Sequence, residues 1–316
     1  MIQRLLDWFR NLRWVQAAVA FAKRLRPWGF EGLSLYYVSV FFVEGLQKGG
    51  ISTRAAAISF RLFLAVFPLI ILLISLIPYV PIDNFQVNLF AGLEGLMPGD
   101  SFDLFESTLE DLMYRKYNSV VSFGFVLLIF YASNSVNAIL MGLNGSYNLV
   151  QKGHPVFIRL ASIVLLLLLG LFLVLAVALI ALSGWFFDWL IAREYLTNEV
   201  TVILLQLAKW VIAVALVYFS ISIIYNTGNF RKKRWKWFSA GASFSTLFFI
   251  LASLLFAWFV NNFASYNRLY GSLGTLMVLL IWVNFNSLIL LLGFELNTSI
   301  HRARRDAERK NLIPPR

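Results

Sequence analysis

Long apolar stretches, separated by short polar segments, make up most of this chain. A helix needs about 20 apolar residues to cross the roughly 30 Å hydrocarbon core of a bilayer, and six stretches reach that length. The segment 160–182 has no charged residue, and no soluble fold needs a helix this long that is apolar on every side. The pattern predicts an all-α, polytopic membrane protein with six transmembrane helices, at 55–80, 120–143, 160–185, 200–225, 239–261 and 273–297.

The composition supports a membrane protein and removes several kinds of site. Hydrophobic residues make up 59% of the chain and charged residues 14%, a balance outside the range of ordinary soluble domains. Because the chain has no cysteine, disulfides and thiolate metal sites are excluded. Basic residues such as Arg4 and Arg10 interrupt the N-terminal segment, so we expect no cleavable signal peptide, and the first span would direct insertion.

Basic residues are distributed unevenly between the two sides of the predicted spans. If the N-terminus is cytoplasmic, nearly all of them lie in the N-terminal segment, the C-terminal segment and the links after the second and fourth spans. Positive residues favour the cytoplasmic side, so we expect both termini to be cytoplasmic. The first outer loop, 81–119, is then rich in acidic residues.

These patterns divide the chain into three parts. Residues 1–53 should form basic interfacial helices, because the apolar segment 33–46 is too short to cross the bilayer. Residues 54–298 should form the six-span membrane domain with its outer acidic loop 81–119, and residues 299–316 a basic cytoplasmic tail. The net charge of +11 then faces anionic membrane lipid rather than nucleic acid.

Three ionisable residues lie inside predicted spans, where such residues are costly and point to function: Arg61, Lys209 and Glu295. Arg61 shares a helix face with Arg54, and Glu295 lies at similar depth in the last span. A pair between Glu295 and either arginine would relieve their desolvation. We expect Glu295 to tie two helices together, with a proton-carrying role as the alternative. Lys209, one turn from Gln206, either extends toward the interface or points into a polar interior.

Uncharged polar residues form two stripes at helical spacing. Asn134, Asn137 and Asn144 lie on one side of the second span, and a similar stripe in the last span starts at Asn284 and ends near Thr298. Such stripes either line a hydrated cavity or hydrogen-bond helices together, and both readings stay open. The candidates for a substrate path or for helix pairing are Arg54, Arg61, Asn134, Asn137, Asn144, Gln206, Lys209, Asn284 and Glu295.

Several short motifs occur in an order that resembles a known family. They are the alanine run Ala55–Ala57, Phe67-Pro68, Leu143-Asn-Gly-Ser-Tyr147, Tyr270-Gly-Ser272 and Leu292-Gly-Phe-Glu-Leu-Asn297. Together they resemble the YihY/virulence factor BrkB family of bacterial inner-membrane proteins, once labelled ribonuclease BN. The resemblance covers about 54–297 and implies six spans and an inner-membrane location. Arg61 departs from the aromatic or small polar residue that the family pattern leads us to expect there.

Ribonuclease chemistry does not fit the residues of this chain. Metal-dependent phosphodiester cleavage needs carboxylates or histidines clustered around one or two ions. The only two histidines are His154 and His301, and the acidic loop 81–119 faces away from the predicted cytoplasm, where RNA would be. Because no phosphate-binding loop and no nucleophile–base pair is visible either, we expect no enzyme activity, no metal and no cofactor.

Two hypotheses for function follow. In the first, the protein translocates a lipid-like or amphiphilic substrate across the inner membrane, using the polar stripes and buried charges but no nucleotide site of its own. In the second, it is a non-transporting scaffold for envelope assembly, in which the stripes join helices and loop 81–119 docks an envelope protein. Anionic membrane lipids are the expected partners and nucleic acid is not, while the sequence indicates no particular oligomeric state.

Overall fold

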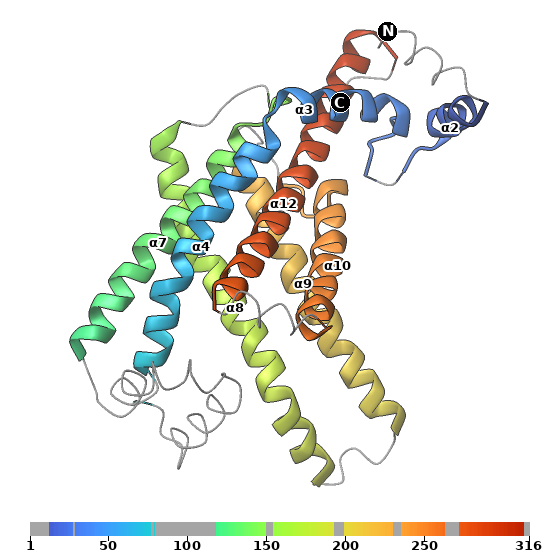
Figure 1. Ribbon diagram of the computed structural model, residues 1–316. Helices are drawn as coiled ribbons and strands as arrows, with labels where there is room; N and C mark the ends of the chain where they lie inside the picture. The colour runs from blue at the N-terminus through green and yellow to red at the C-terminus, as the bar shows by residue number, and fades with distance from the viewer. Residues whose placement is uncertain are drawn as a thin grey trace. The chain divides into compact units, whose positions relative to one another are not determined.

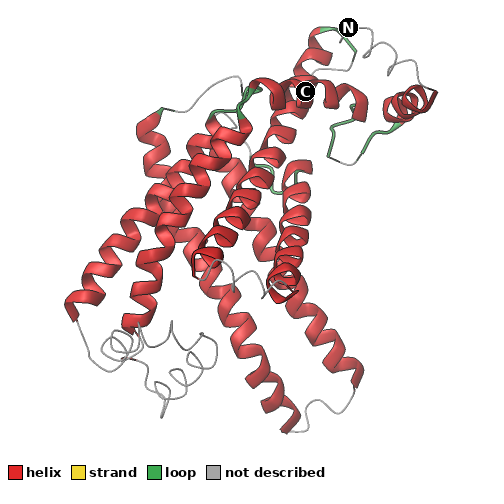
Figure 2. Ribbon diagram, viewed as in Figure 1, coloured by secondary structure: helices red, strands yellow, loops and turns green. Residues whose placement is uncertain are grey.

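The regular secondary structure of the described part of the protein is helical, with loops and turns between the helices (Figures 1 and 2). The structure is a computed structural model that describes residues 13–27, 29–76, 79, 118–149, 154–192, 199–229, 235–262 and 272–312. Within these ranges it has no strand, which confirms the predicted all-α class. The helices are α2 (Arg13–Arg24), α3 (Leu35–Lys48), α4 (Ile51–Leu76), α7 (Asn118–Asn144), α8 (Pro155–Ala192), α9 (Glu199–Gly228), α10 (Ala240–Asn262) and α12 (Ser272–Arg309).

Six of the described helices are long and apolar enough to cross a membrane, which confirms the prediction of six spans. The helix α3 is not among them, because its 14 residues rise only about 21 Å, less than the hydrocarbon core. The spans are Ile51–Leu76, Val121–Asn144, Pro155–Leu179, Ile203–Gly228, Ala240–Val260 and Leu276–Arg309. The cytoplasmic location of both termini and the interfacial position of the N-terminal helices stay predictions.

The chain divides into two compact units, and the division falls inside α4 and α7. Unit 1 consists of residues 1–58 and 136–316, and unit 2 consists of residues 59–135. The described part of unit 2 is mainly the later part of α4 and the earlier part of α7. Each unit has packing contacts of its own.

Unit 1 is built around a close contact between α10 and α12, with α9 against α10 and α8 against α9. A Cβ atom on Gly241 would collide with the main-chain oxygen of Gly293, so small residues let these two helices meet. Tyr225 of α9 joins them, because its hydroxyl donates to the main-chain oxygen of Leu290 at 2.6 Å and lies 2.6 Å from Ser245 Oγ. Three helices are thereby fixed to one another.

The helix α12 extends well beyond the thickness of a membrane. Its 38 residues rise about 57 Å, so it does not end where the sequence predicts a tail, and residues 299–309 continue the last span as helix. On this extension Ile300, Ala303 and Ala307 are buried in one cluster with Val38 of α3. The helix α3 lies beside this end of α12 (Figure 1), where the cluster holds it in place.

In unit 2, the described parts of α4 and α7 lie against each other. Ser135 Oγ of α7 donates to the main-chain oxygen of Arg61 in α4 at 2.7 Å. Further along, Gly124 of α7 faces α4, where an added Cβ would lie 3.9 Å from Ile71. Pro68 lies inside α4, which stays helical from Ile51 to Leu76. These contacts make the two helices a pair within unit 2.

Some sequence predictions concern residues outside the described ranges. The outer acidic loop 81–119 lies outside the described ranges, except for residues 118 and 119. Residues 1–12 and the basic run 231–234 also lie outside them. The role of the loop as a docking surface therefore stays a prediction.

Candidate functional site

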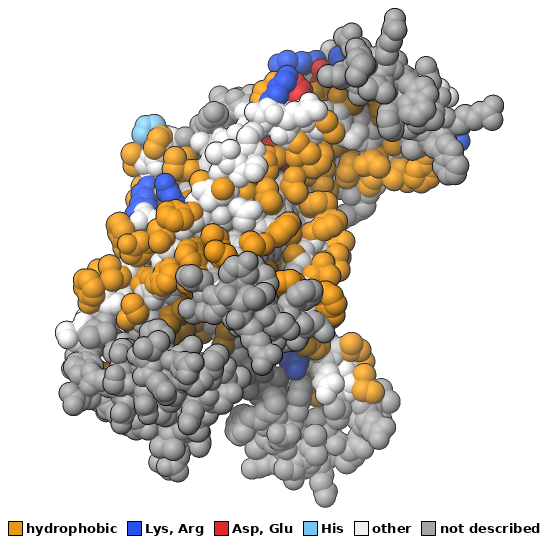
Figure 3. All heavy atoms as spheres, in the orientation of Figure 1, with side chains coloured by type: hydrophobic (Ala, Val, Ile, Leu, Met, Phe, Trp, Pro, Cys, Tyr) orange, Lys and Arg blue, Asp and Glu red, His pale blue; other side chains and the backbone are white. Residues whose placement is uncertain are grey.

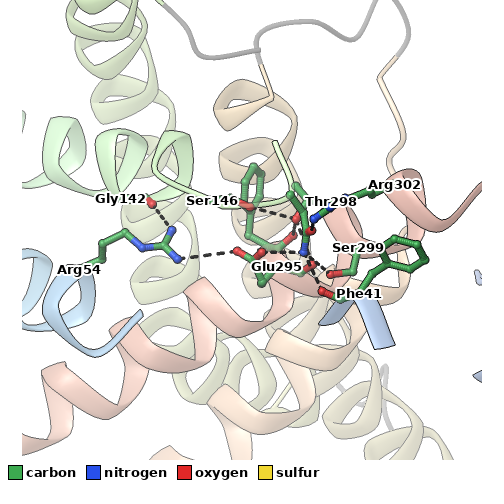
Figure 4. A network of polar contacts seen from close by, with 10 residues as sticks. Phe41, Arg54, Gly142, Ser146, Glu295, Thr298, Ser299 and Arg302 are labelled. Atoms are coloured by element: carbon green, nitrogen blue, oxygen red, sulfur yellow. Dashed lines mark hydrogen bonds and ion pairs between the residues drawn. The ribbon is translucent and has the colours of Figure 1, made fainter. Parts of the chain in front are cut away.

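Glu295 of α12 is fully buried, and segments from several parts of unit 1 meet around its carboxylate (Figure 4). Oε1 of Glu295 accepts a hydrogen bond from Asn148 Nδ2 at 2.9 Å, and Oε2 lies 3.7 Å from Nη2 of Arg54. A buried charge needs a charged or polar partner, so both contacts stabilise the carboxylate. Of the two ion pairs that the sequence left open, the structure makes the one between Glu295 and Arg54.

Arg54 of α4 connects this carboxylate to α7. Its Nη1 donates to the main-chain oxygen of Gly142 at 2.7 Å. Its Nε and Nη2 are buried without a hydrogen-bond partner, as is Oε2 of Glu295. Because 3.7 Å is too long for a hydrogen bond, Arg54 and Glu295 attract each other mainly as charges.

Asn148, in the short link after α7, joins Glu295 to two further segments. Its Nδ2 lies 3.0 Å from the main-chain oxygen of Phe41 in α3 and 2.8 Å from Ser299 Oγ in α12. Its Oδ1 accepts from Arg302 Nη1 at 2.7 Å. A side-chain amide both donates and accepts hydrogen bonds, so this one residue holds α3, α12 and the link together.

The helix α3 covers the Glu295 carboxylate. A Cβ atom on Gly45 would collide with Oε1 of Glu295, so glycine is what allows α3 to lie this close. At the side, the Arg302 guanidinium lies 5.4 Å from the ring centroid of Phe41 and 5.0 Å from that of Tyr147, within the range of cation–π contact. The helices α3, α4 and α12 and the link after α7 thus surround Glu295, and α4 and the link supply the partners of its carboxylate.

A separate ion-pair cluster ties the loop before α3 to α12. Glu31 pairs with Lys236, and its Oε2 lies 3.2 Å from Nη1 of Arg304. Burial opposes the ionisation of Glu31, but the hydrogen bond from Lys236 and the charges of His301, Lys236 and Arg304 outweigh it, and the pKa of Glu31 falls below its usual value. Figure 3 shows basic and acidic side chains next to one another where α3 meets the end of α12.

Arg61, in unit 2, has very different surroundings. It lines a hollow of about 480 Å³ together with Phe60, Leu64, Tyr131 and Asn134. The side chain is exposed, and its guanidinium forms no ion pair or hydrogen bond with the residues that the structure describes. Arg61 lies ten residues, or about 15 Å, from the start of the 26-residue α4. A cation in such a place is suited to bind an anion.

The other sequence candidates lie on three helices of unit 1. Asn137, Asn144 and Asn284 are half-buried, the first two on α7 and the third on α12. On α9, Gln206 is exposed, and Lys209 Nζ lies 5.7 Å from the ring centroid of Trp210. Their part in a substrate path stays a prediction. Among the described residues, no three His, Cys, Asp or Glu side chains group closely enough to hold a metal ion.

The sequence of this chain matches one family over most of its length. The profile of the family described as virulence factor BrkB aligns with residues 42–315. The chain belongs to the virulence factor BrkB family. This confirms the resemblance drawn from the motifs.

Three relatives of this BrkB-family protein carry ribonuclease-like or membrane-protein names. YfkH of Bacillus subtilis, named as ribonuclease-like, is 26% identical over 253 residues, which cover 80% of this chain and 91% of YfkH. The UPF0761 membrane protein NTHI0384 of Haemophilus influenzae is 26% identical over 276 residues, covering 85% and 96% of the two chains. The UPF0761 membrane protein NT05HA_1801 of Aggregatibacter aphrophilus is 24% identical, covering 84% and 92%. No solved structure matches the chain.

The family, the membrane-protein relatives and the six membrane-length helices agree with one another. The BrkB-family protein is therefore a multi-pass protein of the bacterial inner membrane.

Proposed function

We propose that this BrkB-family protein translocates a lipid-like or amphiphilic substrate across the inner membrane, without a nucleotide site of its own. The observation that carries the proposal is the hollow around Arg61. A cation in a spanning helix is costly and usually has either a partner or a function. Arg61 has no ion-pair partner among the described residues and lines a hollow of about 480 Å³.

The lining of the hollow suits a molecule with a polar head and an apolar chain. Arg61, Asn134 and the hydroxyl of Tyr131 supply polar groups, while Phe60 and Leu64 supply apolar surface. Binding sites for such ligands combine a few convergent polar groups with a mainly apolar wall. Because α4 and α7, which carry these residues, are both membrane-length, a substrate can reach the hollow from the bilayer without passing through water.

A second candidate function, the envelope-assembly scaffold, is favoured by the network around Glu295. Polar groups from α3, α4, α12 and the link after α7 bind one another there, and α3 covers them. Such a network fixes helices in place and leaves little room for a ligand. A pure scaffold gives no role to an exposed Arg61, so transport explains more of the molecule.

Reconstitution into liposomes tests the transport proposal. Purified protein is placed in vesicles that contain anionic phospholipid and a fluorescent lipid in both leaflets, and an impermeant quencher then reports how fast the inner label reaches the outer leaflet. We expect faster crossing than in protein-free vesicles, and Arg61→Ala should lose most of this increase. Arg305→Ala is the matched control, because it removes an exposed arginine from α12 that does not line the hollow.

The experiment is repeated with and without a proton gradient, because transport without a nucleotide site can be passive or coupled to an ion gradient. If folded wild-type protein moves no lipid under either condition, the transport proposal is wrong and the scaffold becomes the better assignment. The role of the hollow would also be contradicted if Arg305→Ala abolished lipid crossing as fully as Arg61→Ala does.

A further inference from the structure

The hollow around Arg61 also indicates which headgroup it accepts. We infer that it binds the phosphate of an anionic phospholipid, with Arg61 on the phosphate and the acyl chains along α4 and α7. The inference rests on the proposed function for its site, but it makes a separate claim about the ligand.

The charge of the hollow selects a lipid with net negative charge. The five described residues that line it include one cation and no carboxylate. A zwitterionic headgroup would bring an ammonium group that finds no anion among them, whereas an anionic headgroup brings no second charge to satisfy. The guanidinium of Arg61 can present two parallel donors to phosphate oxygens, and Tyr131 carries a hydroxyl that can add a hydrogen bond.

A second hollow follows the first along the same two helices. It measures about 320 Å³ and is almost entirely apolar, with lining residues Pro68, Ile71, Ser119, Phe123, Gly124 and Leu127. On α4 the lining positions 61, 64, 68 and 71 are three or four residues apart, and so are positions 134, 131, 127 and 124 on α7. Each set therefore lies on one face of its helix. A polar hollow followed by an apolar one matches a headgroup followed by acyl chains.

The surroundings of the hollow favour a lipid over a soluble phosphate compound. Large apolar side chains nearby are exposed, with 58% of Phe60 and 54% of Phe130 accessible. Arg61 lies about 15 Å along α4, inside a membrane-length helix. A soluble phosphate would have to leave water to reach this depth, which is costly for a charged group, whereas the chains of a phospholipid place its head near the membrane already.

Direct measurement of lipid binding tests the inference without relying on transport. Purified protein is titrated with phosphatidylglycerol and with phosphatidylethanolamine of identical chains, and bound lipid is counted by native mass spectrometry. We expect wild-type protein to prefer phosphatidylglycerol by about tenfold, because the ammonium group of phosphatidylethanolamine would lie near Arg61 with no carboxylate among the described lining residues to pair with it. Arg61→Ala should weaken phosphatidylglycerol binding about tenfold to a hundredfold and remove the preference. Arg61→Lys should keep part of the affinity, because lysine retains the charge but loses the paired donors.

Controls separate the inference from the proposed function. Arg305→Ala should bind both lipids as the wild type does, and the melting temperature of Arg61→Ala should show that its fold is intact. Equal binding of the two lipids, or phosphatidylglycerol binding that Arg61→Ala leaves unchanged, overturns the inference even if the protein moves lipid. Soluble glycerophosphate that competes as well as the lipid overturns the assignment to a lipid. Selective, Arg61-dependent binding in a protein that moves no lipid supports the inference and overturns the transport proposal.

Discussion

Glu295 and Arg61 are both ionisable residues in membrane-length helices, but their surroundings differ in every respect. Glu295 is fully buried, accepts a hydrogen bond from Asn148 and lies 3.7 Å from Arg54. Arg61 is exposed and lines an open hollow, without an ion-pair partner among the described residues. One charge has its partners within the protein, and the other faces a space that a ligand can fill.

The difference indicates what each residue contributes. Removing a buried charge leaves its partner unpaired, so the cost appears as lost stability. Removing an exposed charge costs the fold little, so the loss appears only when a ligand is present. Substitutions at the two places should therefore change different measured quantities.

Glu295→Ala should cause the largest loss of stability. It leaves Arg54 largely buried without a counter-charge, and breaking one side of a buried ion pair costs about 3 kcal/mol or more. Thermal unfolding in detergent measures the effect. The double variant with Arg54→Ala should recover part of the loss, because no unpaired charge remains. A double variant less stable than Glu295→Ala alone would show that the pair does not act as described.

Gly45→Ala should destabilise the protein by about 1 to 3 kcal/mol, because the added methyl group collides with the Glu295 carboxylate and pushes α3 away from α12. Gly170→Ala in α8 is the matched control, since a Cβ there has no neighbour within 4 Å and alanine favours a helix. Both variants are compared by thermal unfolding. Equal melting temperatures for the two would mean that α3 does not cover Glu295 closely.

Glu31 should give a smaller effect that depends on pH. Its pKa in the folded protein lies below the unfolded value of 4.5, so its charge stabilises the fold above about pH 4.5 and this stability is lost as pH falls through the lower, folded pKa. Melting temperatures taken between about pH 7 and pH 3 should fall more steeply for wild-type protein than for Glu31→Gln, which lacks the titrating group. Parallel curves would show that the pairs with Lys236 and Arg304 contribute nothing to folding.

Arg61→Ala should change stability least of all, by about 0.5 kcal/mol or less, because the side chain is exposed and leaves no partner unpaired among the residues that the structure describes. Thermal unfolding of the lipid-free protein in detergent is the appropriate measurement. A loss approaching that of Glu295→Ala would mean that Arg61 is a structural residue, and the contrast between the two sites would disappear.

The sequence predicts the membrane helices well, because each is a long apolar run with a physical length requirement. It predicts the site less completely. Arg54 and Arg61 lie seven residues apart on one helix face, so periodicity alone cannot decide which of them meets Glu295. The sequence places Asn134 in a stripe with Asn137 and Asn144, and the structure sets Asn134 in the hollow beside Tyr131, which lies three residues earlier on the same helix.

Other features depend on contacts between distant parts of the chain. Asn148 and Gly45 contact Glu295 although both are distant from it in the sequence, and no local pattern marks either residue. The continuation of α12 did leave a signal. Ile300, Ala303 and Ala307 repeat at helical spacing among basic residues, which predicts a helix with one buried face.

The central claim is that Glu295 holds the fold while Arg61 handles the substrate. The most direct test measures lipid crossing per folded molecule in liposomes for wild-type protein and Arg61→Ala, together with the melting temperature of each preparation. We predict that Arg61→Ala loses most of the crossing while its melting temperature stays within about 2 °C of wild type. The claim would be contradicted if Arg61→Ala moved lipid at the wild-type rate. It would also be contradicted if Arg61→Ala lost crossing but lost as much stability as Glu295→Ala does.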